Sequence, residues 1–103
     1  MVSDKQGKDL KQVLGIIGDK WSALILHDLS KKGPMRFGQC QKNEGINPRT
    51  LTQRLVALEE AGLVKKKEYN EYPPRTEYNI TAKGKELVPV FDQMVKWAEK
   101  HLA

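Results

Sequence analysis

The hydrophobic pattern of this chain changes its period at Gly62, and this change limits the fold more than any other feature. Before Gly62, Leu51, Leu55 and Leu58 recur at the spacing of a helix. After it, residues 63–69 and 76–80 are rich in β-branched and aromatic side chains and predict two strands. Residues 70–75 join them as a stiff tip with two prolines. The sequence therefore predicts a β-hairpin that follows directly on a helix.

Two helices are predicted at the start of the chain. Apolar residues recur at i, i+3, i+4 and i+7 within residues 10–17, which predicts a first helix that ends at Gly18. Asp19 is the predicted N-cap of a second helix, which ends with positive charge before Gly33. This second helix is expected to be the most buried one, through Trp21, Leu24, Ile25 and Leu29.

Two further helices are predicted before the hairpin. Pro34 is expected to start a short third helix around residues 36–42. Asn47 begins the fourth helix, because its side chain caps free N–H groups at the helix start. Pro48 suits the first helical position, since it lacks an N–H that would have no partner there. The fourth helix is expected to stop at Gly62.

Residues 82–102 predict a long last helix, capped by Thr81 and kinked by Pro89 near Lys85. Its apolar residues occupy more than one side. One stripe contains Leu87, Phe91, Met94, Ala98 and Leu102, and Val88, Val90, Val95 and Trp97 lie off it. We therefore expect one face to pack on the chain's own core and another to pack on a partner chain.

Positive charge is concentrated in the middle of the chain. Residues 31–75 hold ten Lys and Arg against five Glu, which accounts for the net charge of +5, and both ends are balanced. A locally basic segment is typical of a surface that binds a polyanion, but it also occurs on solvated faces without that role. Charge alone leaves both interpretations open.

Length and composition exclude several classes of protein. A chain of 103 residues has room for one domain, 1–103, whose core we expect at about residues 9–81. No apolar run approaches the roughly 20 residues of a membrane span, and the polar N-terminus has no signal-peptide pattern, so we expect a cytoplasmic protein. Without a glycine-rich phosphate loop, paired buried carboxylates or a Ser/His/Asp set, neither an enzyme nor a cofactor is expected.

Cysteine and histidine give no sign of a reactive site. Cys40 is the single cysteine, which excludes an internal disulfide, and it is expected in the core with Phe37. His27 and His101 are far apart and have no cluster of ligands beside them, so no metal site is expected.

The order of three helices, a capped fourth helix and a hairpin with a basic tip is that of a winged helix-turn-helix domain. We predict a mainly α fold of the α+β kind, with a two-stranded β-hairpin wing and a long C-terminal dimerisation helix. In such a domain the fourth helix enters the major groove of DNA, and residues near its N-terminus reach base edges. The hairpin then lies beside the neighbouring groove.

The predicted DNA contacts divide into base and backbone contacts. Arg49 suits guanine, Gln53 suits adenine, and a threonine methyl group suits thymine. The recognition helix is expected to contribute Asn47, Pro48, Arg49, Thr50, Thr52, Gln53 and Arg54. The wing and nearby backbone contacts are expected from Lys31, Lys32, Arg36, Lys65, Lys66, Lys67 and Arg75, with Arg75 near the minor groove. The lysines at 65–67 have a second interpretation, because lysines on a strand also prevent edge-to-edge pairing.

The sequence resembles the HxlR-type winged-helix transcription regulators. The matching stretches are IGDKW at 17–21, LIL at 24–26, RFG at 36–38, LTQRL at 51–55, LEEAGLV at 58–64, YPPRTEY at 72–78 and TAKG at 81–84. The resemblance implies a homodimer, held by the first and last helices, that binds palindromic operator DNA and regulates transcription. It also implies that residues 47–54 form the recognition helix and residues 70–75 form the wing.

The expected dimer contacts lie on the apolar faces of the first and last helices: Leu10, Val13, Leu14, Val90, Met94 and Trp97. Trp21 and Trp97 are most simply core and interface residues, and they are also candidates for lining a cavity at the dimer seam for an unknown small-molecule effector. Redox-sensing members of the family carry a cysteine before the first helix. Residues 7–10 have none here, so a thiol switch of that type is not expected.

Two functions from different classes follow from these patterns. The first is a sequence-specific regulator, a repressor or autoregulator, that binds double-stranded DNA as a homodimer. The alternative is a winged helix used as an interaction module that docks an acidic partner protein. Arg49 and Gln53 on an open helix face, with Arg75 at a wing tip, suit neighbouring DNA grooves better than a flat acidic patch.

Overall fold

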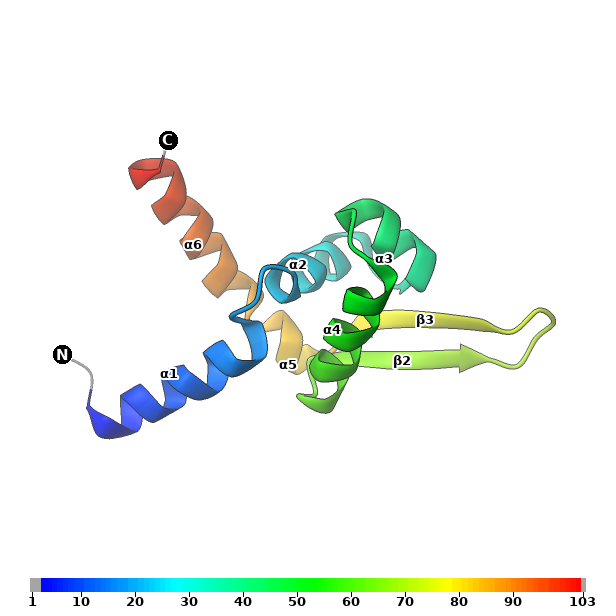
Figure 1. Cartoon of the computed structure of the whole chain (residues 1–103), viewed down its shortest axis with the longest axis horizontal. Helices are drawn as coiled ribbons and strands as arrows, with labels where there is room; N and C mark the ends of the chain where they lie inside the picture. Colours follow the sequence, from blue (N-terminus) through cyan, green and yellow to red (C-terminus); the bar gives the residue numbers. More distant parts are fainter. Residues whose placement is uncertain (1–2, 103) are drawn as a thin grey trace.

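The computed structural model describes residues 3–102 and contains helices followed by a hairpin and two more helices (Figure 1). The elements are α1 (Asp4–Ile17), α2 (Ser22–Lys32), β1 (Met35–Arg36), α3 (Phe37–Glu44), α4 (Pro48–Glu60), β2 (Val64–Tyr69), β3 (Arg75–Ile80), α5 (Ala82–Lys85) and α6 (Val88–His101). The prediction of a mainly helical winged helix-turn-helix domain with a hairpin wing is confirmed.

The core lies where α2, α4 and the sheet meet. Its buried members include Ile25, Leu26 and Leu29 from α2, Leu51, Leu55 and Leu58 from α4, and Met35, Val64 and Ile80 from the sheet. The apolar stripe predicted for α4 is thus confirmed. The prediction for α2 was wrong at Leu24, which is 46% exposed, because Leu26 is the residue that points into the core. Trp21 is half-buried against the edge of this core.

The sheet has a third strand that the sequence analysis placed at the start of a helix. Met35 and Arg36 form β1 and pair with Tyr78 and Glu77 of β3, which gives the strand order β1-β3-β2. The free edge of β3 would otherwise expose unpaired backbone groups. The third helix therefore begins at Phe37, after the strand and not at Pro34.

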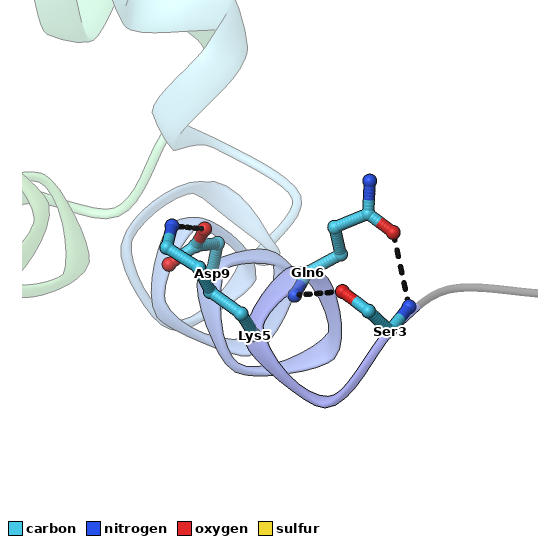
Figure 2. A network of polar contacts seen from close by, with 4 residues as sticks. All are labelled: Ser3, Lys5, Gln6 and Asp9. Atoms are coloured by element: carbon cyan, nitrogen blue, oxygen red, sulfur yellow. Dashed lines mark hydrogen bonds and ion pairs between the residues drawn. The ribbon is translucent and has the colours of Figure 1, made fainter.

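The first helix begins earlier than its apolar stripe. The Ser3 hydroxyl accepts a hydrogen bond from the Gln6 backbone N–H at 3.1 Å, and the Gln6 side chain accepts one from the Ser3 backbone N–H at 2.9 Å (Figure 2). This reciprocal pair is a capping box. Lys5 and Asp9 add an ion pair at 2.9 Å one turn further on (Figure 2). These contacts extend α1 back to Asp4.

The predicted last helix is divided in two. α5 ends at Lys85, and α6 starts at Val88 with Pro89 in its first turn. Proline is tolerated there because the first N–H groups of a helix have no partner within it. The sequence predicted a kink near Lys85 within one continuous helix; the chain instead ends one helix at Lys85 and starts another at Val88, so the single helix was wrong. Thr81 caps α5 as expected, since its hydroxyl accepts from the Gly84 N–H at 3.0 Å.

Helices α1 and α6 diverge as two arms at the end of the molecule opposite the hairpin (Figure 1). The chain measures 55 × 33 × 24 Å, and its radius of gyration is 15.1 Å, against about 13 Å for a compact chain of this length. No described residue of α1 is fully buried. None of the helices within residues 3–102 is long and apolar enough to span a bilayer.

Candidate nucleic-acid interface

Local contacts fix both ends of α4. The Asn47 side chain accepts a hydrogen bond from the Arg49 N–H at 2.8 Å, which confirms the predicted N-cap. At the other end, Gly62 turns the chain with a φ of +78°, a conformation that glycine adopts without strain. The Lys83 ammonium donates to the Ala61 carbonyl at 2.8 Å and so satisfies an oxygen of the last turn. The helix is therefore held at a defined length and angle.

One face of α4 is open to solvent. Arg49 and Gln53 are exposed on it, as expected, and so is Thr52, whereas Leu51 and Leu55 are buried on the opposite side. The Thr52 hydroxyl donates to the Pro48 carbonyl at 3.0 Å, which leaves the Thr52 methyl group for apolar contact. Asn47 and Pro48 are also exposed, and Thr50 is half-buried.

Val56 completes this face and was missing from the predicted contacts. It is 50% exposed and lies one turn beyond Thr52 and Gln53. At helical spacing Val56 lies opposite the buried leucines, so an apolar residue on an otherwise polar face is the sequence signal that marks it. Its methyl groups are suited to contact with a thymine methyl.

Arg54 has different surroundings from Arg49. Its guanidinium Nη1 lies 3.4 Å from the Asp19 carboxylate, and both side chains are half-buried. Burial acts to raise the pKa of Asp19, but the hydrogen bond from the Ser22 hydroxyl, those from the Trp21 and Ser22 N–H groups, and the Arg54 charge together lower it. Asp19 therefore stays ionised and holds Arg54 beside α2.

The hairpin carries its charges on two faces. Lys65 and Lys67 pair with Asn79 and Glu77 of β3, so these four side chains share one face. Arg36 of β1 is also opposite Glu77 and belongs to that face. Lys66 points to the other side, where its ammonium lies 3.5 Å from the Glu68 carboxylate. The three lysines are exposed, as both interpretations of the run require.

The tip of the hairpin is organised around Tyr69. The Arg75 guanidinium lies 3.9 Å from the centre of the Tyr69 ring, and the Lys67 ammonium lies 4.9 Å from it. Arg75 is also 3.2 Å from the Glu71 carboxylate, so it is held at the base of the tip. Tyr72 stands at the extremity and is 99% exposed. Tyr72 was not among the predicted wing contacts.

The remaining predicted backbone contacts lie at the end of α2. Lys31 and Lys32 are exposed in its last turn, and the Lys32 ammonium is 3.1 Å from the Asp28 carboxylate. The positive charges near the C-terminus of a helix also complement its dipole. These two lysines are not part of α4 or of the hairpin, so the predicted site draws on three separate elements.

Cys40 is packed in the core, and His27 lies beside a carboxylate. Cys40 is 1% exposed, in agreement with its predicted place in the core. Burial and the charges of Asp28 and Glu44 raise the pKa of the Cys40 thiol to about 11. His27 lies 3.7 Å from the Asp92 carboxylate. Among residues 3–102, no three His, Cys, Asp or Glu gather as metal ligands.

A groove of about 670 Å³ lies between the two arms and α2. Its lining is mostly apolar and consists of Leu10, Val13, Leu14, Ile17, Gly18, Asp19, Lys20, Ala23, Leu24, Leu87, Val90, Phe91 and Met94. Five of the six predicted dimer contacts are in this set, and Trp97 lies exposed further along α6. Neither Trp21 nor Trp97 lines the groove of the single chain.

Comparison with known proteins agrees with this geometry. The HxlR-like helix-turn-helix family model matches residues 16–103. An uncharacterized HTH-type transcriptional regulator of Halalkalibacterium halodurans is 36% identical over 101 residues, which cover 97% of this chain and 89% of the relative. The HTH-type transcriptional regulator YdeP of Bacillus subtilis is 36% identical over 99 residues, which cover 95% of this chain and 77% of the relative.

Solved structures give the same result. The reduced form of the transcriptional regulator YodB from B. subtilis matches with a TM-score of 0.81 at 30% identity, over 98% of this chain and 95% of that one. The redox regulator HypR in its reduced form matches with a TM-score of 0.81 at 32% identity, over 89% of this chain and 91% of that one. These relatives are regulators and not enzymes, as predicted. The chain belongs to the HxlR family of helix-turn-helix transcriptional regulators.

Proposed function

We propose that this transcriptional regulator works as a cytoplasmic homodimer that binds a palindromic operator and represses transcription by occupying it. The observation that carries this proposal is the open face of α4, where Arg49, Thr52 and Gln53 are exposed on a helix fixed at both ends. A major groove about 12 Å wide admits one such helix. The face has no packing role within residues 3–102, because the core side of α4 is formed by its leucines.

Each exposed side chain on this face has a chemical counterpart on a base edge. Arg49 offers two parallel donors to O6 and N7 of guanine, and Gln53 offers a donor and an acceptor to N6 and N7 of adenine. Thr52 and Val56 present methyl groups that suit thymine. A half-site that contains G, A and T at neighbouring positions is the expected target.

Phosphate contacts set the register of α4 on the duplex in this proposal. The exposed cations on helix and strand ends are Lys31 and Lys32 of α2 and Arg36 of β1. Lys65 and Lys67 lie on the hairpin face that they share with Glu77 and Asn79. Such contacts carry no sequence information themselves, but they position the reading helix. In this proposal the tip, with Arg75 at its base and Tyr72 at its end, contacts the adjacent minor groove.

A second copy of the chain is the proposed occupant of the groove between the arms. Leu10, Leu14, Val90 and Met94 are each about half exposed in the single chain, so a continuous apolar surface faces solvent on both arms. Burying such a surface is favourable at roughly 25 cal/mol per Å² of apolar area. A two-fold dimer would then present two copies of α4 to two half-sites one helical turn apart.

A thiol switch is not part of the proposal. HypR is described as a redox regulator, and reactive cysteines are typically exposed with a lowered pKa. Cys40 is the only cysteine of this chain, it is buried, and its pKa is raised. We infer that an effector of this protein acts by another route.

Selection of bound duplexes from a random library, followed by gel shift against salt, tests the proposal. We expect a palindrome with half-sites about one helical turn apart, and a log–log salt slope that corresponds to several phosphate contacts per subunit. If no sequence were enriched and binding vanished near physiological salt, specific regulation would be excluded. Docking of an acidic partner protein would then be the better interpretation.

A further inference from the structure

The Asp19 carboxylate joins two elements with different roles. It accepts hydrogen bonds from the Trp21 N–H at 2.9 Å and the Ser22 N–H at 3.0 Å, and from the Ser22 hydroxyl, and so it fixes the N-terminus of α2. The same carboxylate lies 3.4 Å from the Arg54 guanidinium of α4. Ser22 is fully buried, so this cluster is anchored in the core. The Asp19 side chain thus contacts both the N-terminus of α2 and the Arg54 guanidinium of α4.

Asp19 also lies at the point where the α1 arm joins the body. It follows Gly18, the C-cap of α1, whose N–H donates to the Leu14 carbonyl and where an added Cβ atom would clash with that oxygen. Asp19 and Gly18 both line the apolar groove between the arms. A short path of covalent and polar contacts, through Gly18 and Asp19 to Arg54, therefore connects the α1 arm to α4.

Arg54 does not point along the open face of α4. At about 100° per residue, it lies about 140° around the helix from Arg49 and about 100° from Gln53. Its side chain is 29% exposed and its guanidinium faces the Asp19 carboxylate. An arginine that reads guanine needs two free donors directed at the groove. Arg54 meets neither condition in this structure.

We propose that Asp19 and Arg54 form a joint that fixes the angle of the recognition helix relative to the dimerisation arms, with Arg54 as a positioning residue and not a base reader. The inference rests on the proposed dimeric function. In a two-fold dimer, the angle between arm and reading helix sets the separation and tilt of the two copies of α4. The joint then determines which half-site spacing the dimer accepts.

Unfolding by urea without DNA tests the joint by itself. Asp19→Asn keeps an oxygen for the α2 N–H groups but loses the charge, and Arg54→Gln removes the guanidinium. We expect the double variant to have a urea midpoint close to that of the weaker single variant, because both changes break the same contact. Arg49→Gln combined with Asp19→Asn is the matched control, and its effects should add. Additive effects of Asp19→Asn and Arg54→Gln would show that the two side chains are not coupled. This result would overturn the proposed joint and leave the proposed function intact.

Binding to a series of operators tests the role of the joint. The duplexes carry the selected half-sites at spacings that differ by one base pair, together with one duplex that has a single half-site. For the wild type we expect about a tenfold preference for one spacing. Asp19→Asn and Arg54→Gln should both reduce this preference to about twofold, with the base preference and single-half-site affinity little changed, whereas Arg54→Lys should retain most of it.

A different pattern would identify Arg54 as a base reader. In that case Arg54→Gln would change the preference at one base position, and Asp19→Asn would leave spacing and base preference as in the wild type. This result would overturn the proposal. If the wild type selected no sequence at all, the proposed function would fail together with the spacing claim, and the unfolding experiment would still decide whether the two side chains are coupled.

Discussion

Arg49 and Arg54 lie on the same helix but differ in what surrounds their guanidinium groups. Arg49 is exposed on the open face of α4, whereas Arg54 is paired with the Asp19 carboxylate at 3.4 Å. A bidentate contact to guanine requires donors that are free and directed outward. The residue type alone is thus a poor guide to its role on a recognition helix, because burial and pairing decide which arginine is available.

Arg49→Ala is expected to weaken operator binding by about 1 to 3 kcal/mol and to relax the preference at one base position only. The reason is the loss of a bidentate contact to a single base. Lys65→Ala is the control: it should weaken binding to all sequences alike and lower the salt slope by about 1. Gel shifts with single-base variants of the operator measure both. Unchanged affinity and base preference in Arg49→Ala would contradict the assignment of α4 as the reading helix.

Cys40 is expected to make stability depend on pH in the alkaline range. Burial and two nearby carboxylates raise its pKa to about 11, so the folded chain keeps the thiol proton while the unfolded chain releases it at a lower pH. A raised pKa in the folded state gives a stabilising contribution that is present below the unfolded pKa and is lost as the pH rises toward 11. The difference in unfolding free energy between the wild type and Cys40→Ala should therefore shrink from pH 8 to pH 11. A constant difference would show that the thiol ionises equally in both states.

At the level of elements, residues typical of helix ends predicted where α4 begins. Asn47 and Pro48 gave the start of α4 because one caps N–H groups and the other needs no partner. Ser3 and Gln6 have the spacing of a capping box, which indicates a helix that starts at Asp4. The apolar stripe begins only at Leu10, so a prediction from the stripe alone missed the first two turns of α1.

Other elements depend on contacts that no local pattern contains. β1 is two residues long and exists because the edge of β3 offers it partners. The Asp19–Arg54 pair joins residues 35 positions apart in the sequence, so no local pattern predicted it, and Arg54 was expected only as one of the DNA contacts of the recognition helix. For the hairpin, alternation predicted the strands, but the stacking of Arg75 on Tyr69 came from the cross-strand register, which pairs these two residues.

Asn47→Ala is expected to lower the free energy of unfolding by about 1 kcal/mol, because the first turn of α4 loses the acceptor for its Arg49 N–H. Asn47→Asp retains a side-chain oxygen and should be within a few tenths of a kcal/mol of the wild type. Urea unfolding without DNA measures the effect of both variants on the folded chain alone. Equal stability of Asn47→Ala and Asn47→Asp would mean that the cap does not stabilise α4.

The hairpin and the two arms lie at opposite ends of the molecule (Figure 1). Arg49 and Gln53 are exposed on α4 and Lys65 on the hairpin, whereas the two arms expose five large apolar residues: Leu10, Leu14, Val90, Met94 and Trp97. A small domain with half-exposed apolar arms gains stability when a second copy covers them. In the proposed dimer, the second copy would cover the exposed apolar side chains of both arms.

Leu14→Lys is expected to convert the dimer to a monomer at micromolar concentration, because a charge would be placed in the centre of the apolar interface. Val56→Lys is the matched control: Val56 is 50% exposed and Leu14 is 52% exposed, but Val56 lies on the open face of α4. Sedimentation equilibrium should show a monomer for Leu14→Lys and a dimer for Val56→Lys. A dimer in both variants would place the interface elsewhere.

The most direct test compares the dissociation constant of the selected operator with that of a scrambled duplex of equal length and composition at physiological salt. If α4 reads bases in the major groove, the operator should bind at least about 10³-fold more tightly. Two chains should be present on each operator duplex. Equal affinity for the two duplexes would contradict sequence-specific recognition by this protein, however tight the binding to either one.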